Sequence, residues 1–338
     1  MAEDSGIHWT VGITDYIQPP AGIEQQAFPE AEFVFLNDPA EDGRSWHAAD
    51  ALLVWHYPVD DDLIPFLENC RIVVRYGVGY DTVDVETLTG ADILFCNTPD
   101  YGTEEVADAA CAMILALQRN TVRYDRACRC YETGWQEHRL ESQQRTSACA
   151  VGIVGVGRIG TAVALRLKPF GFRLLGYDPY KPSGHEKAIG YERMRSLEEL
   201  LSQADIVTIH CPLTEETRGM ADGAFFDAMR PGASLVNTAR GGLLKDLDCL
   251  EEALRSERLA STAMDVLPSE PPDDHPLLSA WRREEPWLRG RLIVNPHVAW
   301  YSQQGWREMR YKAAETARMY LLEGELRNQI LPDGPVVR

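Results

Sequence analysis

The chain has 338 residues, of which 45% are hydrophobic and 25% are charged, a composition typical of folded globular proteins. Its 52 acidic residues outnumber its 33 basic ones, for a formal net charge of −19, which excludes a generic binder of nucleic acid or of an anionic membrane surface. The length predicts two domains. The acidic start, MAEDSGIHWT, lacks the basic and apolar regions of a signal peptide, so we expect none, and no apolar run is long enough to span a membrane.

The eight cysteines are scattered and show neither the paired spacing of a zinc site nor the density of a disulfide scaffold. Cys128 and Cys130 form a C-x-C, but in a segment that reads as helical, where residues two apart point to different faces. We therefore expect no metal site, and free thiols in a cytoplasmic protein.

The first third of the chain alternates short β-rich runs with helical stretches, which is typical of a parallel sheet covered by helices. A long apolar helix is expected over 103–119, followed by a polar segment, 121–148, that we interpret as a helix and an interdomain loop. The expected strands are 9–15, 32–36, 51–55, 71–77 and 92–98, and the expected helices between some of them are 61–70 and 83–91.

A second alternating series follows, and it ends in a helix over 302–325 with an apolar stripe. Its expected strands are 150–155, 173–178, 205–211, 234–239, 261–266 and 291–298. We predict an α/β fold with two doubly wound parallel-sheet domains, in which a Rossmann NAD-binding domain (121–300) is inserted into a flavodoxin-like substrate-binding domain (1–120 and 301–338). A cleft between the two domains is the expected ligand site.

The sequence VGIVGVGRIG contains G-x-G-x-x-G at Gly155, Gly157 and Gly160, between an expected strand and an expected helix. The three glycines are expected to allow a tight turn, a close approach of backbone to a pyrophosphate, and close packing of helix on strand. Asp178 ends the next strand, 23 residues after Gly155, where an acid hydrogen-bonds the ribose hydroxyls and repels a 2′-phosphate. This predicts NAD(H), with NADP(H) as the alternative because Lys181 lies close by.

Three further stretches place polar side chains just past expected strands: VNTARGG with Arg240, MDVLPSE with Glu270, and NPHVAW with His297. In a doubly wound sheet such strand ends converge on the ligand crevice. A lone histidine at a strand end is more often structural, but the arginine and the glutamate at matching positions favour a catalytic role.

At these motifs, together with RYGVGYDTVDV and NTPDYGTEEVAD in the first domain, the chain resembles the D-isomer-specific 2-hydroxyacid dehydrogenase family over nearly its whole length. PHVAWYSQQ, AVALRLKPFGFRLLGYDPY and LVNTARGGLL are similar to its C-terminal-binding-protein branch, NAD(H)-bound transcriptional corepressors of animals. The resemblance implies catalytic roles for Arg240, Glu270 and His297 and a homodimer formed through the NAD-binding domain. It implies substrate contacts at Trp55, His56, Arg75, Val78, Gly79, Trp300 and Met309. It implies cofactor contacts at Val78, Val106, Gly155, Gly157, Arg158, Ile159, Gly160, Asp178, Cys211, Pro212, Thr217, Thr238, Ala239, Arg240, Asp265 and His297.

The expected chemistry is the reduction of a small anionic 2-oxo acid to a D-2-hydroxy acid. Arg75 and Arg240 would hold the anion, His297 would donate the proton, and Glu270 would orient the imidazole ring and favour its charged form. His210 is expected to be structural. Two alternatives stay open: an NAD(H)-sensing partner-binding protein with little turnover, and an enzyme acting on a phosphonate- or phosphite-type anion.

Overall fold

The computed structural model describes residues 8–15, 17–129, 135–136, 139–140 and 143–335. The chain forms two compact units: the first comprises 1–102 and 302–338, and the second comprises 103–301. Each unit has its own parallel sheet, which confirms the predicted fold class.

The first unit is built on a five-stranded parallel sheet in the order β2-β1-β3-β4-β5. This order reverses between β1 and β3, and the crevice at the carboxyl ends of two such strands is the usual ligand site of an open α/β sheet. Its strands are β1 (Trp9–Ile13), β2 (Ala31–Phe35), β3 (Ala51–Val54), β4 (Ile72–Arg75) and β5 (Leu94–Cys96). Its helices are α1 (Gly22–Ala27), α2 (Pro39–Ala48), the 3-10 turn η1 (Ile64–Phe66), α3 (Val85–Gly90) and α12 (Gln303–Glu323).

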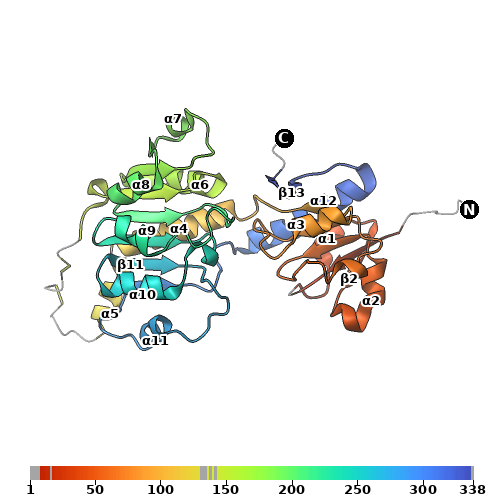
Figure 1. The fold of residues 1–338 in the computed structure, drawn as a ribbon, viewed down its shortest axis with the longest axis horizontal. Coiled ribbons are helices and arrows are strands. Elements are labelled where there is room, and N and C mark those ends of the chain that lie inside the picture. The colour runs from red at the N-terminus through yellow and green to blue at the C-terminus, as the bar shows by residue number, and fades with distance from the viewer. Residues whose placement is uncertain (1–7, 16, 130–134, 137–138, 141–142, 336–338) are drawn as a thin grey trace, which may run out of the picture. The chain divides into compact units, whose positions relative to one another are not determined.

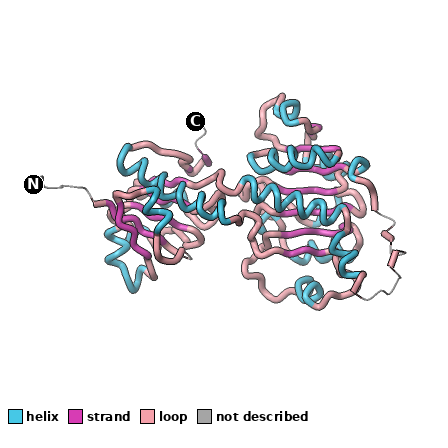
Figure 2. Tube along the Cα trace, turned by 180° about the vertical axis from the view of Figure 1, so that it is seen from behind, coloured by secondary structure: helices cyan, strands magenta, loops and turns pink. Residues whose placement is uncertain are grey.

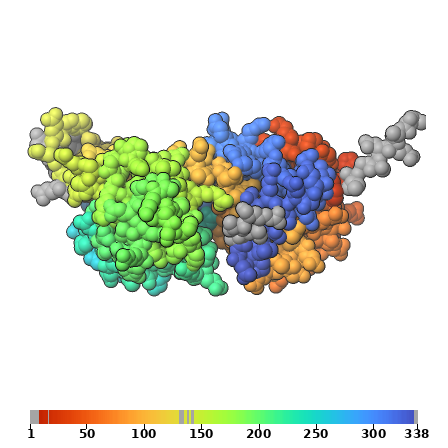
Figure 3. Space-filling model, turned by 90° about the horizontal axis from the view of Figure 1, so that it is seen from above, coloured from red at the N-terminus to blue at the C-terminus, as the bar shows by residue number. Residues whose placement is uncertain are grey.

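Helix α12 comes from the C-terminal end of the chain, yet it packs on α1, β3 and β4 of the first unit. In Figure 3 its blue atoms lie beside the red and orange atoms of the N-terminal strands and helices. A short antiparallel hairpin follows it, β13 (Ile330–Leu331) with β14 (Gly334–Pro335). The chain therefore returns to its first unit after completing the second.

The second unit contains a seven-stranded parallel sheet in the order β12-β11-β10-β9-β6-β7-β8, with helices on both faces (Figures 1 and 2). Its strands are β6 (Ala150–Val154), β7 (Arg173–Tyr177), β8 (Glu192–Arg193), β9 (Ile206–Ile209), β10 (Ala233–Asn237), β11 (Leu259–Met264) and β12 (Leu292–Val294). Its α-helices are α4 (Thr103–Gln118), α5 (Thr121–Ala127), α6 (Arg158–Leu167), α7 (His185–Ile189), α8 (Leu197–Gln203), α9 (Gly223–Ala228), α10 (Leu247–Arg255) and α11 (Pro276–Arg282). Its 3-10 turns are η2 (Thr146–Ala148), η3 (Lys168–Phe170) and η4 (Gly241–Leu243).

Strand β6 shows why this sheet is covered on both faces. All five of its residues are buried. Val151 and Ile153 belong to one apolar core, whereas Ala150 and Val154 belong to the core on the opposite face. Successive side chains of a strand point to opposite faces, so a continuous apolar run fits a strand buried on both sides.

The second unit begins at residue 103, where α4 starts, whereas the predicted boundary was residue 121. The buried α4 residues Ala107, Cys111 and Ile114 share one core with Val151 and Ile153 of β6. The helix therefore packs with the second unit, although it follows the strands of the first along the chain.

Two expected elements differ in the structure. The segment 61–70 forms the short turn η1 and not an α-helix, because Pro65 lacks the backbone N–H that a longer helix needs. Strand β12 ends at Val294, before the end of the strand expected over 291–298, and His297 lies in the loop that follows it.

Candidate active site

The glycine-rich loop joins β6 to α6 in a βαβ unit. Gly155 has φ +86°, and a Cβ atom there would lie 2.7 Å from the backbone nitrogen of Cys211, so only glycine fits this turn. A Cβ on Gly160 would lie 2.1 Å from the Gly155 oxygen, whereas nothing lies within 4 Å of a Cβ built on Gly157. The space at Gly157 is thus left open in front of α6, where helix amide groups attract phosphate.

Asp178 follows β7 and is joined to the glycine-rich loop. One of its carboxylate oxygens accepts a hydrogen bond from the backbone N–H of Val156 at 2.9 Å, and the other accepts from that of Tyr180 at 3.0 Å. The Tyr180 hydroxyl donates to Glu216, which lies in the loop after β9. The carboxylate is therefore held at the strand end, where a ribose diol would meet it.

The loop after β9 begins with His210 and Cys211. Burial lowers the pKa of His210 to about 3 and raises that of the Cys211 thiol to about 12, so both side chains stay neutral near pH 7. The Thr217 hydroxyl donates to the carbonyl of Pro212 at 2.6 Å, which closes this loop on itself.

Two buried polar atoms, one just past β9 and one just past β10, support a bound dinucleotide. In the described part of the chain, His210 Nδ1 and Thr238 Oγ1 are buried and have no hydrogen-bond partner. Such atoms are costly unless a ligand or water satisfies them. Together with the glycine-rich loop, the α6 N-terminus and Asp178, they fit NAD(H).

Arg240 follows β10 in a short, tightly packed turn. Asn237 orders the turn, since its side chain donates to the Arg240 carbonyl at 2.9 Å and accepts from the Ala239 N–H at 3.0 Å. A Cβ on Gly241 would lie 1.8 Å from the carbonyl oxygen of Leu267. The two loops that carry Arg240 and Glu270 thus meet backbone to backbone.

Glu270 and His297 form a direct pair, with 2.6 Å between Glu270 Oε2 and His297 Nδ1. The other oxygen, Oε1, accepts the backbone N–H of Leu267 at 2.8 Å. Burial acts to raise the pKa of Glu270, but the hydrogen bond and charge of His297, the Leu267 N–H and the charge of Arg240 outweigh it and leave the pKa below its ordinary value. Glu270 is therefore a carboxylate at neutral pH, and it holds one ring nitrogen of His297.

Asp265 holds the loop of His297 by three hydrogen bonds. Its buried carboxylate accepts backbone N–H groups from Val298 and Ala299, each at 3.0 Å, and its carbonyl accepts the N–H of His297 at 2.7 Å. His297 has φ +52°, an uncommon conformation for a residue with a side chain, which the surrounding structure must hold in place. Trp300 adds a bond from its indole N–H to the His297 carbonyl at 2.9 Å.

In the first unit, the loop that contains Arg75, Val78 and Gly79 follows β4 and is fixed by two residues that follow β5. The Thr98 hydroxyl donates to the Arg75 carbonyl at 2.9 Å and accepts from the Gly77 N–H at 2.7 Å, while the Asn97 side chain donates to the Val78 carbonyl at 2.7 Å. Arg75 is buried and donates to the Tyr76 carbonyl. The sequence analysis missed the supporting roles of Asn97 and Thr98, although both stand in the quoted motif NTPDYG.

The other predicted site residues differ in exposure. Trp55 is partly exposed and His56 is exposed at the end of β3, with their rings 4.7 Å apart between centroids. Val106 on α4 is buried, and Met309 on α12 is completely buried. Trp306, three residues before Met309, is partly exposed and lies 5.2 Å from Trp55 between ring centroids. The sequence analysis missed Trp306, whose only signal was a large aromatic in the first turn of the last helix.

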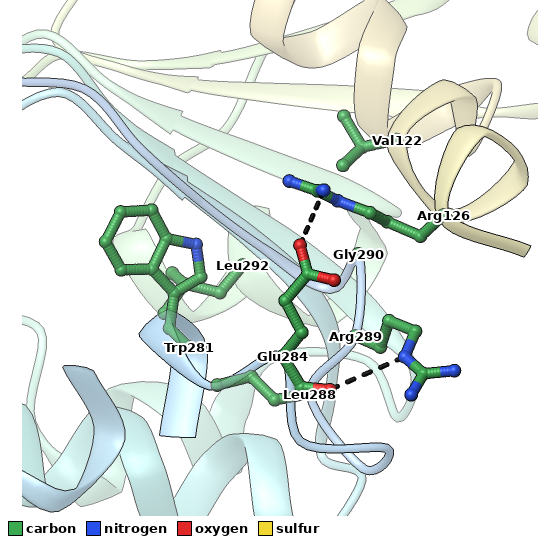
Figure 4. A pocket seen from close by; sticks show the side chains of 8 residues that line it. All are labelled: Val122, Arg126, Trp281, Glu284, Leu288, Arg289, Gly290 and Leu292. Atoms are coloured by element: carbon green, nitrogen blue, oxygen red, sulfur yellow. Dashed lines mark hydrogen bonds and ion pairs between the residues drawn. The ribbon is translucent and has the colours of Figure 1, made fainter. Parts of the chain in front are cut away.

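The described residues offer few candidates for other kinds of site. They contain no group of three or more His, Cys, Asp or Glu side chains placed to hold a metal ion, and no helix among them is both long and apolar enough to cross a membrane. Cys128 is exposed, and Cys130 lies outside the described residues. A small cavity of about 30 Å³ is bordered by the ion pair between Arg126 and Glu284 (Figure 4). None of the residues that line it is a predicted site residue.

The glycine-rich loop, Asp178 and the strand order define a dinucleotide-binding α/β protein, and comparison with known proteins gives its family. Residues 111–299 match the family model described as D-isomer specific 2-hydroxyacid dehydrogenase, NAD binding domain. Because this match covers more than half of the chain, the protein belongs to the D-isomer specific 2-hydroxyacid dehydrogenase family, and it carries the family's NAD-binding domain.

Two curated relatives are named D-3-phosphoglycerate dehydrogenase. One, from Mycobacterium leprae (strain TN), is 32% identical over 290 residues, which are 86% of this chain and 52% of the relative. The other, from Methanocaldococcus jannaschii, is 33% identical over 273 residues, 81% of this chain and 49% of the relative. The chain thus spans about half the length of these relatives.

Solved structures share the fold over nearly the whole chain. A glyoxylate reductase from Paecilomyes thermophila has a TM-score of 0.82 at 25% identity, with 96% of this chain and 99% of that one covered. The apo D-mandelate dehydrogenase of Rhodotorula graminis has a TM-score of 0.81 at 25% identity, with 98% of each chain covered. The names of these two proteins specify different acids.

Proposed function

We propose that this protein is an NAD(H)-dependent reductase that converts a small 2-oxo acid into a D-2-hydroxy acid. The observation that carries the proposal is the pair formed by Glu270 and His297, 2.6 Å apart, at the carboxyl edge of the sheet that holds the dinucleotide-binding loop. Arg240 lies at the same edge and contributes positive charge at Glu270.

The proposed role of His297 is that of general acid. Its Nδ1 faces Glu270, which leaves Nε2 for the proton that the developing alkoxide takes up. The Glu270 carboxylate fixes the ring orientation and stabilises the imidazolium by its charge. When NADH is bound, it supplies the hydride that the carbonyl carbon accepts. Proton transfer by a positioned side chain contributes roughly 10²–10⁴-fold to a rate.

The proposed roles of Arg240 and Arg75 are to bind the carboxylate and keto oxygen, since a guanidinium can donate two parallel hydrogen bonds. Trp55, His56, Val78, Gly79, Trp300 and Met309 are the proposed further substrate contacts. The proposed cofactor contacts are the glycine-rich loop with Arg158 and Ile159, the residues Val78, Val106, Asp178, Cys211, Pro212 and Thr217, and Thr238, Ala239, Arg240, Asp265 and His297.

The test is to follow the loss of NADH absorbance with a panel of acids, beside the variant His297→Ala. The panel contains glyoxylate, hydroxypyruvate, pyruvate, phenylpyruvate, 4-methylthio-2-oxobutyrate and phosphonopyruvate, with D-3-phosphoglycerate and NAD in the oxidative direction because of the relatives' names. We expect turnover of at least one acid, reduced at least about 100-fold in the variant while NADH still binds. Unchanged turnover in the variant would refute the role of His297.

Two other functions would be visible in the same experiment. Tight NADH binding with negligible turnover of every acid would favour an NAD(H)-sensing, partner-binding protein, the function implied by the likeness of PHVAWYSQQ to the C-terminal-binding-protein branch. Turnover of phosphonopyruvate alone would favour an enzyme for phosphonate-type anions.

Two properties of the whole protein belong to the same proposal. We propose a homodimer formed through the NAD-binding domain, which the mass measured in solution tests. We also propose a cytoplasmic location, because each of the seven described cysteines is a free thiol, as in proteins of reducing compartments.

A further inference from the structure

The carboxyl edge of the first unit's sheet carries a group of aromatic rings where the strand order reverses. Asp15 comes two residues after β1 and Trp55 directly after β3, so they flank the crevice between these strands. One Asp15 carboxylate oxygen accepts from the Thr14 hydroxyl at 2.6 Å and from the Trp55 backbone N–H at 3.0 Å. The backbone of Trp55 is therefore fixed at the crevice.

Trp306 joins this edge from the other end of the chain. Ser302 caps α12 by accepting the Gly305 N–H at 2.8 Å, which places Trp306 in the first turn of the helix. Its ring lies 5.2 Å from that of Trp55 between centroids, tilted by 58°, and the Trp55 ring lies 4.7 Å from that of His56. The rings of Trp55, His56 and Trp306 are here called the aromatic shelf. Trp55 and Trp306 are partly exposed and His56 is exposed, whereas most large apolar side chains of this unit are buried.

A buried ion pair holds the Trp306 side of the shelf. The Arg310 guanidinium lies one turn further along α12, 5.6 Å from the centre of the Trp306 ring. It donates to both carboxylate oxygens of Glu24 on α1, at 2.6 and 2.7 Å, and the Tyr76 hydroxyl donates to the same carboxylate at 3.1 Å. Such a bidentate pair is geometrically specific, so Arg310 presents a fixed surface against the indole.

The charges around the shelf suit an uncharged ligand group. The positive charge of Arg310 is matched by Glu24, and Asp15 adds a negative charge at the backbone of Trp55. A phosphoryl group would meet repulsion from Asp15, whereas a neutral flat ring could lie against the indoles in an offset or edge-to-face arrangement.

We propose that Trp306 determines substrate specificity and that the aromatic shelf binds the uncharged, flat side chain of an aryl-substituted 2-oxo acid. This inference rests on the proposed function, because it names the class of acid that the same reaction takes. Met309, three residues further on, is completely buried, whereas the Trp306 side chain is partly exposed.

The experiment compares kcat/KM for phenylpyruvate, pyruvate and phosphonopyruvate with NADH in the wild type, Trp306→Leu and Trp306→Phe. We expect the wild type to prefer phenylpyruvate, and Trp306→Leu to lower kcat/KM for phenylpyruvate about tenfold while changing that for pyruvate less than about threefold. Trp306→Phe should retain most of the preference for phenylpyruvate, since it keeps an aromatic face. Tyr311→Leu, which removes an exposed ring from the same helix, is the matched control and should leave all three values unchanged.

The same variants separate failure of this inference from failure of the proposed function. If the wild type reduces acids but Trp306→Leu lowers kcat/KM equally for all of them, or for none, the shelf is not a specificity site. If the wild type reduces no acid, the proposed function fails, and calorimetric binding of phenylpyruvate and pyruvate to the NADH-loaded protein decides. Selective weakening of phenylpyruvate binding by Trp306→Leu would then still support the shelf, and equal binding by the wild type and the variant would refute it.

Discussion

Glu270 and His297 lie on the loops that follow two neighbouring strands, β11 and β12, and 2.6 Å separates Glu270 Oε2 from His297 Nδ1. The two residues are 27 positions apart in the chain, so the contact is produced by the sheet and not by local sequence. The same two strands also bring Asp265 within hydrogen-bond distance of the backbone of His297.

The first prediction concerns the pH dependence of stability in Glu270→Gln. The pKa of Glu270 is lowered in the folded protein, so its contribution to stability is fully present above the unfolded value of about 4.3 and is lost as the pH falls through the lowered folded value. We expect the wild type to exceed Glu270→Gln in free energy of unfolding at pH 6, and the difference to shrink towards pH 3. Urea denaturation at both pH values measures it, and a constant difference would contradict the assignment.

The second prediction is that Asp265→Asn lowers turnover by displacing His297. The Val298 and Ala299 N–H groups donate to different oxygens of the Asp265 carboxylate. In the variant an amide NH2 group replaces one of these oxygens, so one N–H loses its acceptor at a cost of about 1–3 kcal/mol. Because these groups adjoin His297 at φ +52°, we expect kcat to fall more than stability alone explains. A normal kcat in the folded variant would show that Asp265 does not position His297.

The third prediction compares two glycines of the same loop. Gly157→Ala meets no atom within 4 Å and should fold with a free energy of unfolding within about 0.5 kcal/mol of the wild type. It should nevertheless bind NADH roughly tenfold more weakly, since the methyl group occupies the approach to the pyrophosphate.

Gly160→Ala should instead affect the free energy of unfolding more than NADH affinity, because its Cβ would lie 2.1 Å from the Gly155 oxygen. We expect a loss of stability of about 1–3 kcal/mol from overpacking. Thermal unfolding and NADH fluorescence titration measure the two quantities, and wild-type NADH affinity in Gly157→Ala would argue against the proposed phosphate position.

The fourth prediction is a double-mutant cycle on the buried pair of Glu24 and Arg310. Glu24→Gln or Arg310→Met alone leaves an uncompensated buried charge and should cost about 3–5 kcal/mol. The double variant removes both charges and keeps an acceptor for the Tyr76 hydroxyl, so we expect it to be more stable than either single variant. Additive losses in urea denaturation would show that the pair is not coupled.

The sequence by itself determined the class of fold and the main candidates for site residues. Alternating apolar runs and helices specify parallel sheets, and Gly155, Gly160 and Asp178 belong to a local βαβ unit whose spacing follows from one turn, one helix and one strand. Arg240, Glu270 and His297 could be named as candidates because each lies just past an apolar strand, and apolar strands can be recognised along the sequence.

Only the tertiary structure decided how distant residues meet. Helix α4 belongs to the second unit because its apolar face shares a core with β6, which no local pattern shows. Asp265 accepts its bonds from a loop more than thirty residues away, and Trp306 meets Trp55 because α12 returns to the first unit after the second is complete. Contacts of this kind depend on packing between segments far apart in the chain, and local propensity and periodicity carry no information about such packing.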